Sequence, residues 1–273
     1  MTLGSEAKNH GQRGLVLIED LSNGKERFAV PVLLSPRQKV DPAVFDYFRY
    51  SPRIVDAKKI IQTQHSPSGT GFDCSCQGTC LDEFGCDCSS RVYGKDGRVS
   101  NVSVLMKATV RECSSSCACD LWCGNRVAQK GPCYPVEIFA RDAKCGWGVR
   151  SSVDIPEGAF VGEYTGELIN DDEAALRKDN TFLFETVIGM ETYTIDAKFY
   201  GNYTRFINHS CEPNVKVANV CWDACQDQLV HMCLFSVKEI ETGEELTIDY
   251  GDAWWINKKF PCLCESSSCR YRP

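Results

Sequence analysis

Short β-like runs, separated by Gly, Pro, Asn and Asp, dominate the second half of the chain. Such runs bounded by turn residues are typical of β-strands. They are VEIFA (136–140), FVGEYTGELI (160–169), TYTID (192–196), LVHMCLFSVKEI (229–240) and EELTIDY (244–250). Residues 15–34 read as two further short strands around a Ser-Asn-Gly turn. The pattern therefore predicts a mostly β protein.

One segment, residues 171–179, has a helical pattern. Asn170 can cap this helix, and Glu173 follows three residues later, as in a capping box. Residues 35–73 hold four prolines and predict mostly loop, and the polar residues 1–14 predict disorder. No stretch approaches ~18 consecutive apolar residues, which argues against a membrane span.

Composition leaves room for one large domain or two small ones in 273 residues. With 43% hydrophobic and 25% charged residues, the chain has an ordinary globular balance. The formal net charge is −7, from 30 basic and 37 acidic residues. This balance argues against direct nucleic-acid binding and favours a basic partner.

The unusual feature is the content of 18 cysteines. A secreted disulfide protein and an intracellular metalloprotein both fit that number. Three Asn-x-Ser/Thr sequons, at Asn101, Asn202 and Asn208, favour secretion, whereas the N-terminus lacks the apolar run of a signal peptide. The spacing of the cysteines has to decide between the two.

The first array places nine cysteines within 50 residues that have little apolar pattern. Three Cys-x-Cys pairs cannot close on themselves as ordinary disulfides, and neighbours two apart in an extended chain can chelate together. Because zinc prefers four thiolates, nine sulfurs complete three sites when three of them bridge, as in a Zn3Cys9 cluster. The predicted ligands are Cys74, Cys76, Cys80, Cys86, Cys88, Cys113, Cys117, Cys119 and Cys123.

The second array, near the C-terminus, has three cysteines and lacks a fourth ligand. Cys211, in the sequence Asn-His-Ser-Cys, is the best candidate to complete it. The predicted site is Cys211, Cys262, Cys264 and Cys269. The other five cysteines (133, 145, 221, 225 and 233) are expected to be core or surface thiols, and disulfides or free thiols remain the alternative for both arrays.

Four motifs lie between the two arrays. They are Cys145–Arg150 (CGWGVR), Glu163–Glu167 (EYTGE), Arg205–Cys211 (RFINHSC) and Glu245–Tyr250 (ELTIDY). Each motif alone has an ordinary structural interpretation, such as a turn, a half-buried strand residue, a polar cap or a core tyrosine. Their order, and their position between two chelating arrays, indicates a specific family.

Over residues 20–273 the chain resembles the SET-domain protein lysine methyltransferases that carry a cysteine-rich pre-SET cluster and a post-SET zinc site. The resemblance implies small β-sheets with a pseudoknot, in which the stretch 205–211 threads through a neighbouring loop. The implied organisation is a disordered segment 1–14, strands and loops at 15–73 packing on the SET core, a pre-SET cluster at 74–123, a SET domain at 134–251 and a post-SET segment at 252–273.

The resemblance also implies S-adenosylmethionine as the methyl donor, together with zinc. The implied cofactor-binding residues are Cys145, Gly146, Trp147, Phe182, Arg205, Asn208, His209 and Leu263. Tyr250 and Tyr164 are the implied catalytic residues. Phe184, Ile248, Trp254 and Glu185 are the implied substrate-channel residues, with Glu185 a candidate partner for an arginine of the substrate tail.

The chemistry requires an uncharged lysine amine. A free lysine has a pKa near 10.4, so deprotonation at neutral pH costs about 4 kcal/mol. An apolar channel and a nearby sulfonium both lower that cost, and Tyr250 is expected to orient the amine. Relatives usually have Phe or Tyr where this chain has Ile248, and the smaller side chain predicts room for more than one methyl group.

Segments around Tyr200–Asn202, Asp171–Phe184 and Asp249–Asp252 look most like the enzymes that methylate lysine 9 of histone H3. The implied partners are the histone H3 tail and the nucleosome in nuclear chromatin, with no sequence-specific nucleic-acid binding and no membrane. The tail would add as a strand between the SET core and the post-SET segment. A non-catalytic SET-fold module, a methyltransferase for another lysine and a secreted disulfide protein are the alternatives.

Overall fold

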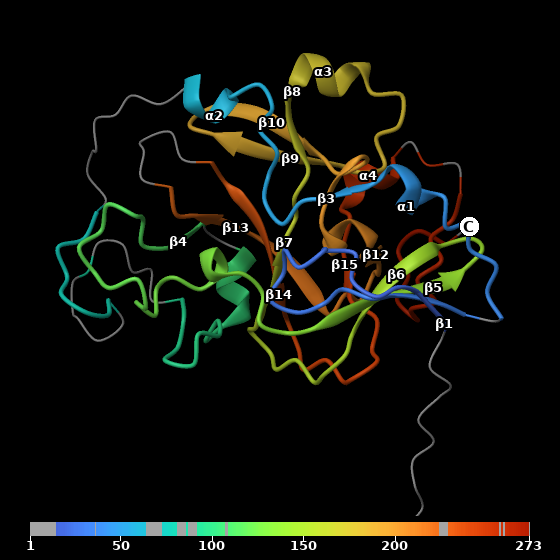
Figure 1. Cartoon of the computed structure of the whole chain (residues 1–273), viewed down its shortest axis with the longest axis horizontal. Helices are drawn as coiled ribbons and strands as arrows, with labels where there is room; N and C mark the ends of the chain where they lie inside the picture. The colour runs from blue at the N-terminus through green and yellow to red at the C-terminus, as the bar shows by residue number, and fades with distance from the viewer. Residues whose placement is uncertain are drawn as a thin grey trace, which may run out of the picture.

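The computed structural model describes residues 15–35, 37–63, 73–80, 86, 92–106, 109–223, 229–256, 258 and 260–272. The predicted disordered segment 1–14 and the predicted zinc ligand Cys88 lie outside these residues, as does Cys225. Within them the chain is mostly β, as predicted, and its strands form five small sheets (Figure 1).

The first sheet has the order β1 (Leu15–Ile18), β2 (Val32–Leu34), β5 (Val136–Asp142), β6 (Gly146–Ser151). The two strands predicted in residues 15–34 are present and antiparallel, and the turn between them contains Asn23 at φ 52° and Gly24 at φ 76°. β2 also pairs in parallel with β5. The N-terminal segment is thereby part of the sheet that ends at the CGWGVR motif.

The second four-stranded sheet has the order β4 (Val110–Arg111), β13 (Val215–Cys221), β14 (His231–Ser236), β7 (Phe160–Glu163). A three-stranded antiparallel sheet has the order β8 (Glu167–Asn170), β10 (Glu191–Asp196), β9 (Leu183–Ile188). Two parallel pairs complete the set: β11 (Tyr200–Gly201) with β3 (Arg49–Tyr50), and β12 (Asn208–His209) with β15 (Thr247–Ile248).

The helices are short. The predicted helix is α3 (Asp171–Leu176), which begins where Asn170 accepts a 3.0 Å hydrogen bond from the backbone N–H of Glu173 and ends before residue 179. The Glu173 side chain pairs with Lys58. The other helical segments are α1 (Val44–Tyr47), α2 (Ile60–Thr63), α4 (Asp252–Trp255) and the 3-10 turns η1 (Val102–Met106), η2 (Ala128–Lys130) and η3 (Tyr203–Phe206). No helix in the described part of the chain is long and apolar enough to cross a bilayer.

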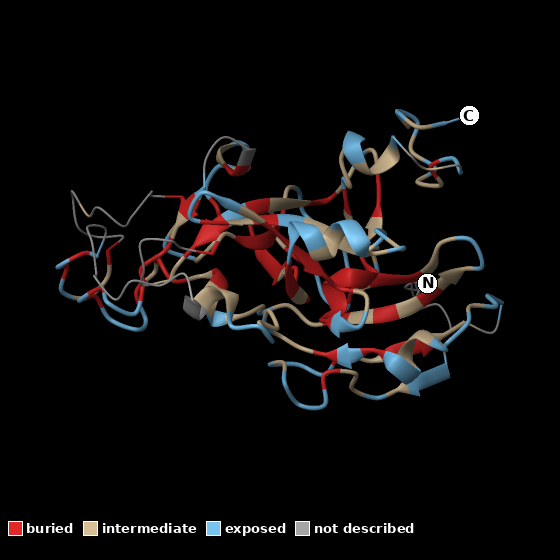
Figure 2. Cartoon of the chain, turned by 90° about the horizontal axis from the view of Figure 1, so that it is seen from above, coloured by how far each residue is buried: buried red, intermediate tan, exposed pale blue. Residues whose placement is uncertain are grey.

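Buried segments run through the middle of the molecule, where the sheets face one another (Figure 2). Ile138, Ile195, Ile207 and Leu234, from four different segments, share this core. The cysteine-rich segment forms one end of the long axis in Figure 1 and has a core of a different kind. Its buried cluster is made of cysteines, while Trp122 between them is 87% exposed. Around the cysteines, sulfur therefore takes the place of hydrocarbon, whereas Val99 and Val110 of the same segment join an apolar cluster of the SET core.

A buried ionic cluster ties β7 and β14 to the end of β13. The two ring nitrogens of His231 lie 2.7 Å from a Glu163 oxygen and 3.2 Å from an Asp223 oxygen. Burial alone would disfavour the charged ring, but the hydrogen bonds to Asp223 and Glu163 outweigh it and raise the pKa of His231 to about 9. The ring is therefore a cation at neutral pH, held between two carboxylates.

The raised pKa predicts how stability depends on pH. Because the folded-state pKa lies above the value near 6.5 of an unfolded chain, the stabilisation is fully present below pH 6.5 and is lost as pH rises through about 9. We expect the free energy of unfolding to fall by roughly 2–3 kcal/mol more in the wild type than in His231→Gln between pH 6.5 and 9.5. Urea titrations at several pH values measure this difference, and parallel pH curves for the two proteins would contradict it.

Candidate active site and metal centres

The parallel pairing of β12 with β15 joins two of the sequence motifs. Asn208 lies opposite Thr247 and His209 opposite Ile248. Just beyond β15, the backbone N–H of Tyr250 donates a 3.1 Å hydrogen bond to Nδ1 of His209, and its hydroxyl donates a 2.8 Å bond to the carbonyl of Ile207. The predicted catalytic tyrosine is thus fixed at both ends by the RFINHSC segment.

A narrow cavity of about 70 Å³ opens beside Tyr250. Seven predicted site residues line it together: Tyr164, Phe182, Phe184, Arg205, Ile248, Tyr250 and Trp254. Thr181, Leu183, Thr204 and Ile207 complete the wall. The rings of Tyr250 and Trp254 meet edge to face at 4.8 Å, and those of Tyr164 and Phe184 lie 5.3 Å apart. Such a wall suits an extended aliphatic side chain.

The two tyrosines in this cavity are neutral hydrogen-bonding groups. Burial raises the pKa of Tyr164 and of Tyr250 above that of a free phenol. Tyr164 donates its hydroxyl proton to the carbonyl of Phe182 at 2.9 Å, as Tyr250 does to Ile207. Each phenol oxygen keeps its lone pairs as acceptors. The pair can therefore orient an amine, whereas neither phenol is a base at neutral pH.

Arg205 is a buried cation beside the cavity. Its guanidinium lies 4.0 Å from the centre of the Phe182 ring and 4.5 Å from that of Phe206, and Nε donates a 2.7 Å hydrogen bond to the carbonyl of Ala197. Burial lowers the pKa of Arg205 to about 10. The guanidinium supports the Phe182 wall. A cation at this place also disfavours a second positive charge in the cavity, so it favours a neutral amine there.

Asn208 has an amide whose orientation is fixed by two acceptors. Its Nδ2 donates to the carbonyl of Trp147 at 3.0 Å and to Oε1 of Glu245 at 2.8 Å. With both amide hydrogens engaged, Oδ1 keeps its lone pairs as acceptors. The Glu245 carboxylate also pairs with Arg141, whose Nε lies 3.2 Å from Glu245 Oε2. The sequence motif contained Glu245, but its role is seen only in the structure.

The CGWGVR turn reaches this network at the junction of β5 and β6. Gly146 has φ +74°, a backbone conformation that side chains rarely adopt, and an added Cβ at Gly148 would lie 2.7 Å from Glu245 Oε1. The backbone N–H of Cys145 is held at 2.8 Å by Asp142. Arg141 extends the network to the post-SET segment by donating to the carbonyl of Leu263 at 3.5 Å.

This arrangement fits the predicted cofactor. Trp147, Asn208 and Leu263 are joined by the network around Glu245 and Arg141, with Cys145 and Gly146 in the turn before Trp147, and Phe182 and Arg205 line the cavity. Oδ1 of Asn208 offers an acceptor to the ammonium of an amino acid or to an adenine amine. S-adenosylmethionine bound by these residues would point its methyl group toward the cavity beside Tyr250.

The first cysteine array forms overlapping four-sulfur groups. Within each group the sulfurs lie within 4.8 Å of one another: Cys74, Cys76, Cys80 and Cys86 in one, and Cys74, Cys80, Cys113 and Cys119 in the other. Two cysteines belong to both groups, as bridging thiolates would. Cys117 and Cys123 are buried in the same cluster. No disulfide bond joins any of the described cysteines, so the disulfide alternative finds no support among them.

The predicted post-SET group is also assembled. The sulfurs of Cys211, Cys262, Cys264 and Cys269 lie within 4.8 Å of one another. Despite burial, hydrogen bonds from nearby backbone and thiol groups lower the pKa of Cys264 to about 7. Backbone N–H groups also face sulfurs in both arrays, from Arg270 to Cys211 and from Cys80 to Cys123. Four sulfurs with such donors fit a closed tetrahedral metal site.

His209 connects the metal site with the cavity. Because Nδ1 accepts from Tyr250, the proton of the neutral ring lies on Nε2, which is 3.3 Å from the sulfur of Cys211. The ring also packs against Trp255 at 5.0 Å and Tyr271 at 5.8 Å. The His209 ring therefore links the post-SET residues Trp255 and Tyr271 to the backbone of Tyr250.

Two predicted channel residues differ in their placement. Trp254, in α4, lines the cavity. Glu185 is exposed, and its neighbour Phe184 takes the cavity-facing position on β9. β9 is the edge strand of its sheet, so its outer backbone groups from Leu183 to Thr186 have no neighbouring strand in the described part of the chain. An edge of this kind can pair with an added peptide.

Comparisons with known proteins agree with this geometry. The SET domain family model matches residues 146–251, and the Pre-SET motif model matches residues 22–126. The two matches together contain the β12–β15 pair, the first cysteine array and every cavity-lining residue except Trp254.

The chain belongs to the SET-domain family with a Pre-SET motif. It is 36% identical to mouse histone-lysine N-methyltransferase EHMT1 over 264 residues, covering 92% of this chain. It spans about 20% of that relative's length.

Solved structures show the same fold. Arabidopsis thaliana SUVH6, in complex with SAM, has a TM-score of 0.78 and 30% identity, covering 97% of this chain and 57% of that one. KRYPTONITE, in complex with mCHH DNA, an H3(1-15) peptide and SAH, has a TM-score of 0.76 and 30% identity, covering 94% of this chain and 54% of that one.

The Glu245 network predicts a measurable effect on cofactor affinity. In Glu245→Leu the amide of Asn208 loses one of its two acceptors and can rotate, so we expect S-adenosylhomocysteine to bind at least 10-fold more weakly. Glu245→Gln keeps an acceptor oxygen of similar shape and should lose less. Isothermal titration calorimetry compares the three proteins, and equal affinities would show that Glu245 does not position Asn208.

Proposed function

We propose that this chain is an S-adenosylmethionine-dependent protein lysine methyltransferase that acts on the tail of histone H3, with lysine 9 as the main target. The observation that carries the proposal is the cavity lined by neutral Tyr164 and Tyr250 next to the Asn208 network. Relatives named histone-lysine N-methyltransferases, and a neighbour solved with an H3 peptide, support the substrate class.

When bound, S-adenosylmethionine supplies an electrophilic methyl group. Asn208 and the turn at Cys145–Trp147 would hold its amino-acid and nucleoside parts. The cavity would hold the lysine side chain, where apolar walls and the Arg205 cation favour the neutral amine. The oxygens of Tyr164 and Tyr250 accept from the amine hydrogens and align its lone pair, so alignment rather than proton abstraction by a side chain carries the catalysis.

The tail is proposed to bind as an extra strand on the open edge of β9, with the post-SET segment as the opposite wall. Glu185 lies exposed on this strand and would pair with an arginine of the tail. Ile248 contributes a smaller side chain to the cavity than an aromatic residue would. We therefore expect addition of more than one methyl group. The place of action would be chromatin in the nucleus, with the nucleosome as the physiological substrate.

Mass spectrometry of histone H3 after incubation with enzyme and S-adenosylmethionine tests the proposal, because it reports the lysine and the degree of methylation together. We expect dimethylation or trimethylation at lysine 9. Binding of the cofactor without transfer to any histone or lysine-rich peptide would instead favour a non-catalytic module.

The variant Tyr250→Phe tests the proposed role of the Tyr250 hydroxyl, because it removes that hydroxyl and keeps the packing of the ring. We expect kcat to fall on the order of 100-fold with little change in Tm, because the amine loses an acceptor that aligns it. Tyr193→Phe is the control, since Tyr193 is a buried tyrosine whose hydroxyl bonds Glu191 away from the cavity. Full activity in Tyr250→Phe would remove its proposed role.

We also propose four zinc ions, three in the first array with Cys88 as its ninth ligand and one in the post-SET group. Cys264→Ser should lower the zinc content from about four to about three per chain and weaken S-adenosylhomocysteine binding, because the site adjoins Leu263 and His209. Exposed Cys133, outside both groups, provides the matched control Cys133→Ser. Elemental analysis with calorimetry tests this, and zinc loss from both arrays would contradict separate sites.

A further inference from the structure

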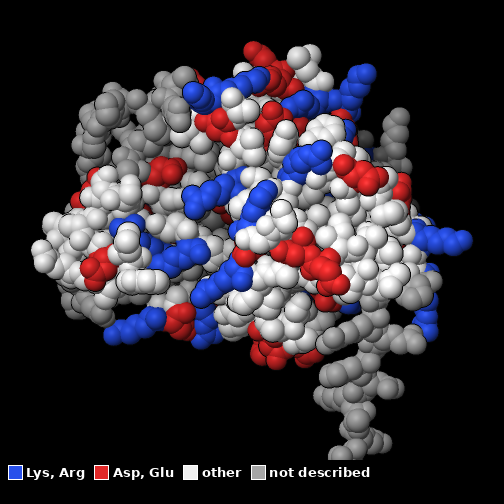
Figure 3. All heavy atoms as spheres, viewed as in Figure 1, with Lys and Arg blue, Asp and Glu red and all other residues white. Residues whose placement is uncertain are grey.

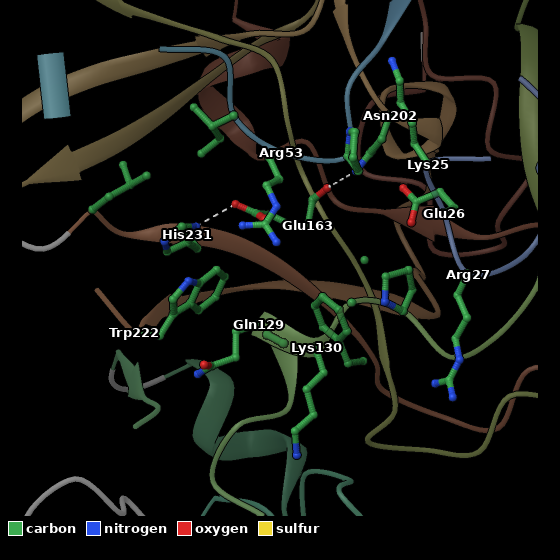
Figure 4. A pocket seen from close by; sticks show the side chains of 18 of the residues that line it. Lys25, Glu26, Arg27, Arg53, Gln129, Lys130, Glu163, Asn202, Trp222 and His231 are labelled. Carbon is green, nitrogen blue, oxygen red and sulfur yellow. Dashed lines mark hydrogen bonds and ion pairs between the residues drawn. The ribbon is translucent and has the colours of Figure 1, made fainter. Parts of the chain in front are cut away.

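A second and larger cavity, of about 370 Å³, lies beside β7, and Figure 4 draws most of the residues that line it. Successive residues of the same segments face the two cavities. Glu163 and Tyr203 line the large cavity, while Tyr164 and Thr204 line the channel. The proposed methyl transfer makes no use of this space.

The acidic groups of the large cavity are already engaged inside the protein. Glu163 and Asp223 bind the two nitrogens of His231, on whose ring Trp222 stacks with centroids 3.5 Å apart. Glu26 accepts a 2.9 Å hydrogen bond from the hydroxyl of Tyr50. These carboxylates therefore offer little to a cationic ligand.

The rim of the cavity is basic and exposed. Lys25, Arg27, Arg53 and Lys130 border it, from the turn after β1, the segment after β3, and η2. Arg53 forms no side-chain hydrogen bond or ion pair within the described residues, and Figure 4 shows it reaching over Glu163. Together with cationic His231, the basic groups outnumber the acidic ones, although the whole chain carries −7.

The arrangement of these cations favours an extended anion over a compact one. Figure 4 shows Lys25 extending to one side and Arg27 and Lys130 to the other, from separate positions, so the three side chains do not converge on one point. Figure 3 shows Lys and Arg side chains spread across the middle of the face that it views, with a group of acidic side chains beside them. Spaced single charges around an open rim match the repeated phosphates of a nucleic-acid backbone.

We propose that the rim formed by Lys25, Arg27, Arg53 and Lys130 is a docking surface for the phosphate backbone of double-stranded DNA. The contact is independent of base sequence, because the rim presents charges and no element that enters a groove. DNA binding itself does not depend on the proposed methyl transfer. We further infer that DNA binding at this rim brings the enzyme to its nucleosomal substrate, and this step rests on the proposed function.

Charge reversal at Arg27 and Arg53 tests the proposal. Lys25 and Lys130 are kept, because they donate to the backbone carbonyls of Tyr50 and Cys123, whereas Arg27 donates to the sulfur of exposed Cys133 at 3.2 Å. Fluorescence anisotropy with a 20-base-pair duplex, from 25 to 150 mM salt, compares the full chain with Arg27→Glu/Arg53→Glu. Arg37→Glu/Lys39→Glu is the matched control, since both residues are exposed in the loop after β2 and neither lines the cavity.

The expected result is at least 10-fold weaker binding by the rim variant than by the control, with a salt slope reduced by about two. Equal binding by the two variants, or no binding by the wild type at 25 mM salt, would overturn the proposal. Displacement of the duplex by micromolar ATP or pyrophosphate, or equally well by polyglutamate, would also overturn it in favour of a free phosphate ligand or a general polyanion.

Activity measurements separate this proposal from the proposed function. Methylation of an H3 peptide should be unchanged in the rim variant, whereas methylation of nucleosomes should fall at least 5-fold. If no protein methylates the peptide, the function fails while the anisotropy result still decides the docking surface. If peptide and nucleosome activities fall together, the variant has disturbed the fold and the docking role is refuted.

Discussion

The parallel pairing of two-residue strands β12 and β15 is the contact on which the site depends. It places Asn208 and His209 beside the segment that ends in Tyr250, although almost 40 residues separate them in sequence. From this contact Asn208 reaches toward Trp147 and Glu245, His209 toward Cys211, and Tyr250 toward the cavity. The proposed cofactor pocket, the proposed metal site and the channel therefore all adjoin this one pair of strands.

The cysteine clusters are compatible with zinc, and metal coordination would supply the cohesion that burial cannot. The first array has an almost purely cysteine core, and the post-SET group has few apolar neighbours beyond the aromatic rings around His209. Donors such as Arg126, whose guanidinium lies 3.4 Å from the sulfur of Cys119, offset the negative charge that thiolates bring. Both segments can therefore remain short and irregular while still holding the surfaces that the SET core requires.

Sequence pattern and spacing predicted the mostly β class, the Asn170 cap and the grouping of Cys211 with the last three cysteines. They missed β6, β9 and β13. Alternation is present in β13 (VKVANVC), but the glycines of β6 mask its strand character. The cysteine groups could be predicted from sequence because chelation requires ligands at short, regular spacings along the chain. The channel residues were named through family resemblance, since no local pattern records that four distant segments will share a cavity.

Other features arise only from three-dimensional packing. Glu245 looks like an ordinary polar strand residue until Asn208 and Arg141 are seen on its two oxygens. Likewise, an overall charge of −7 pointed away from nucleic acid, because a sum over the chain does not show that four cations share one rim. Long-range pairing decides such features, and it is the part of a fold least visible in local sequence.

The open edge of β9 has a consequence for selectivity. A ladder of main-chain hydrogen bonds is the same for every amino acid, so it can grip a guest segment firmly without reading it. Discrimination then falls to side chains that alternate along the guest, with every second position turned away from the enzyme. A protein built in this way should tolerate substitutions at the guest positions that face away from it, provided that a lysine occurs in the correct register.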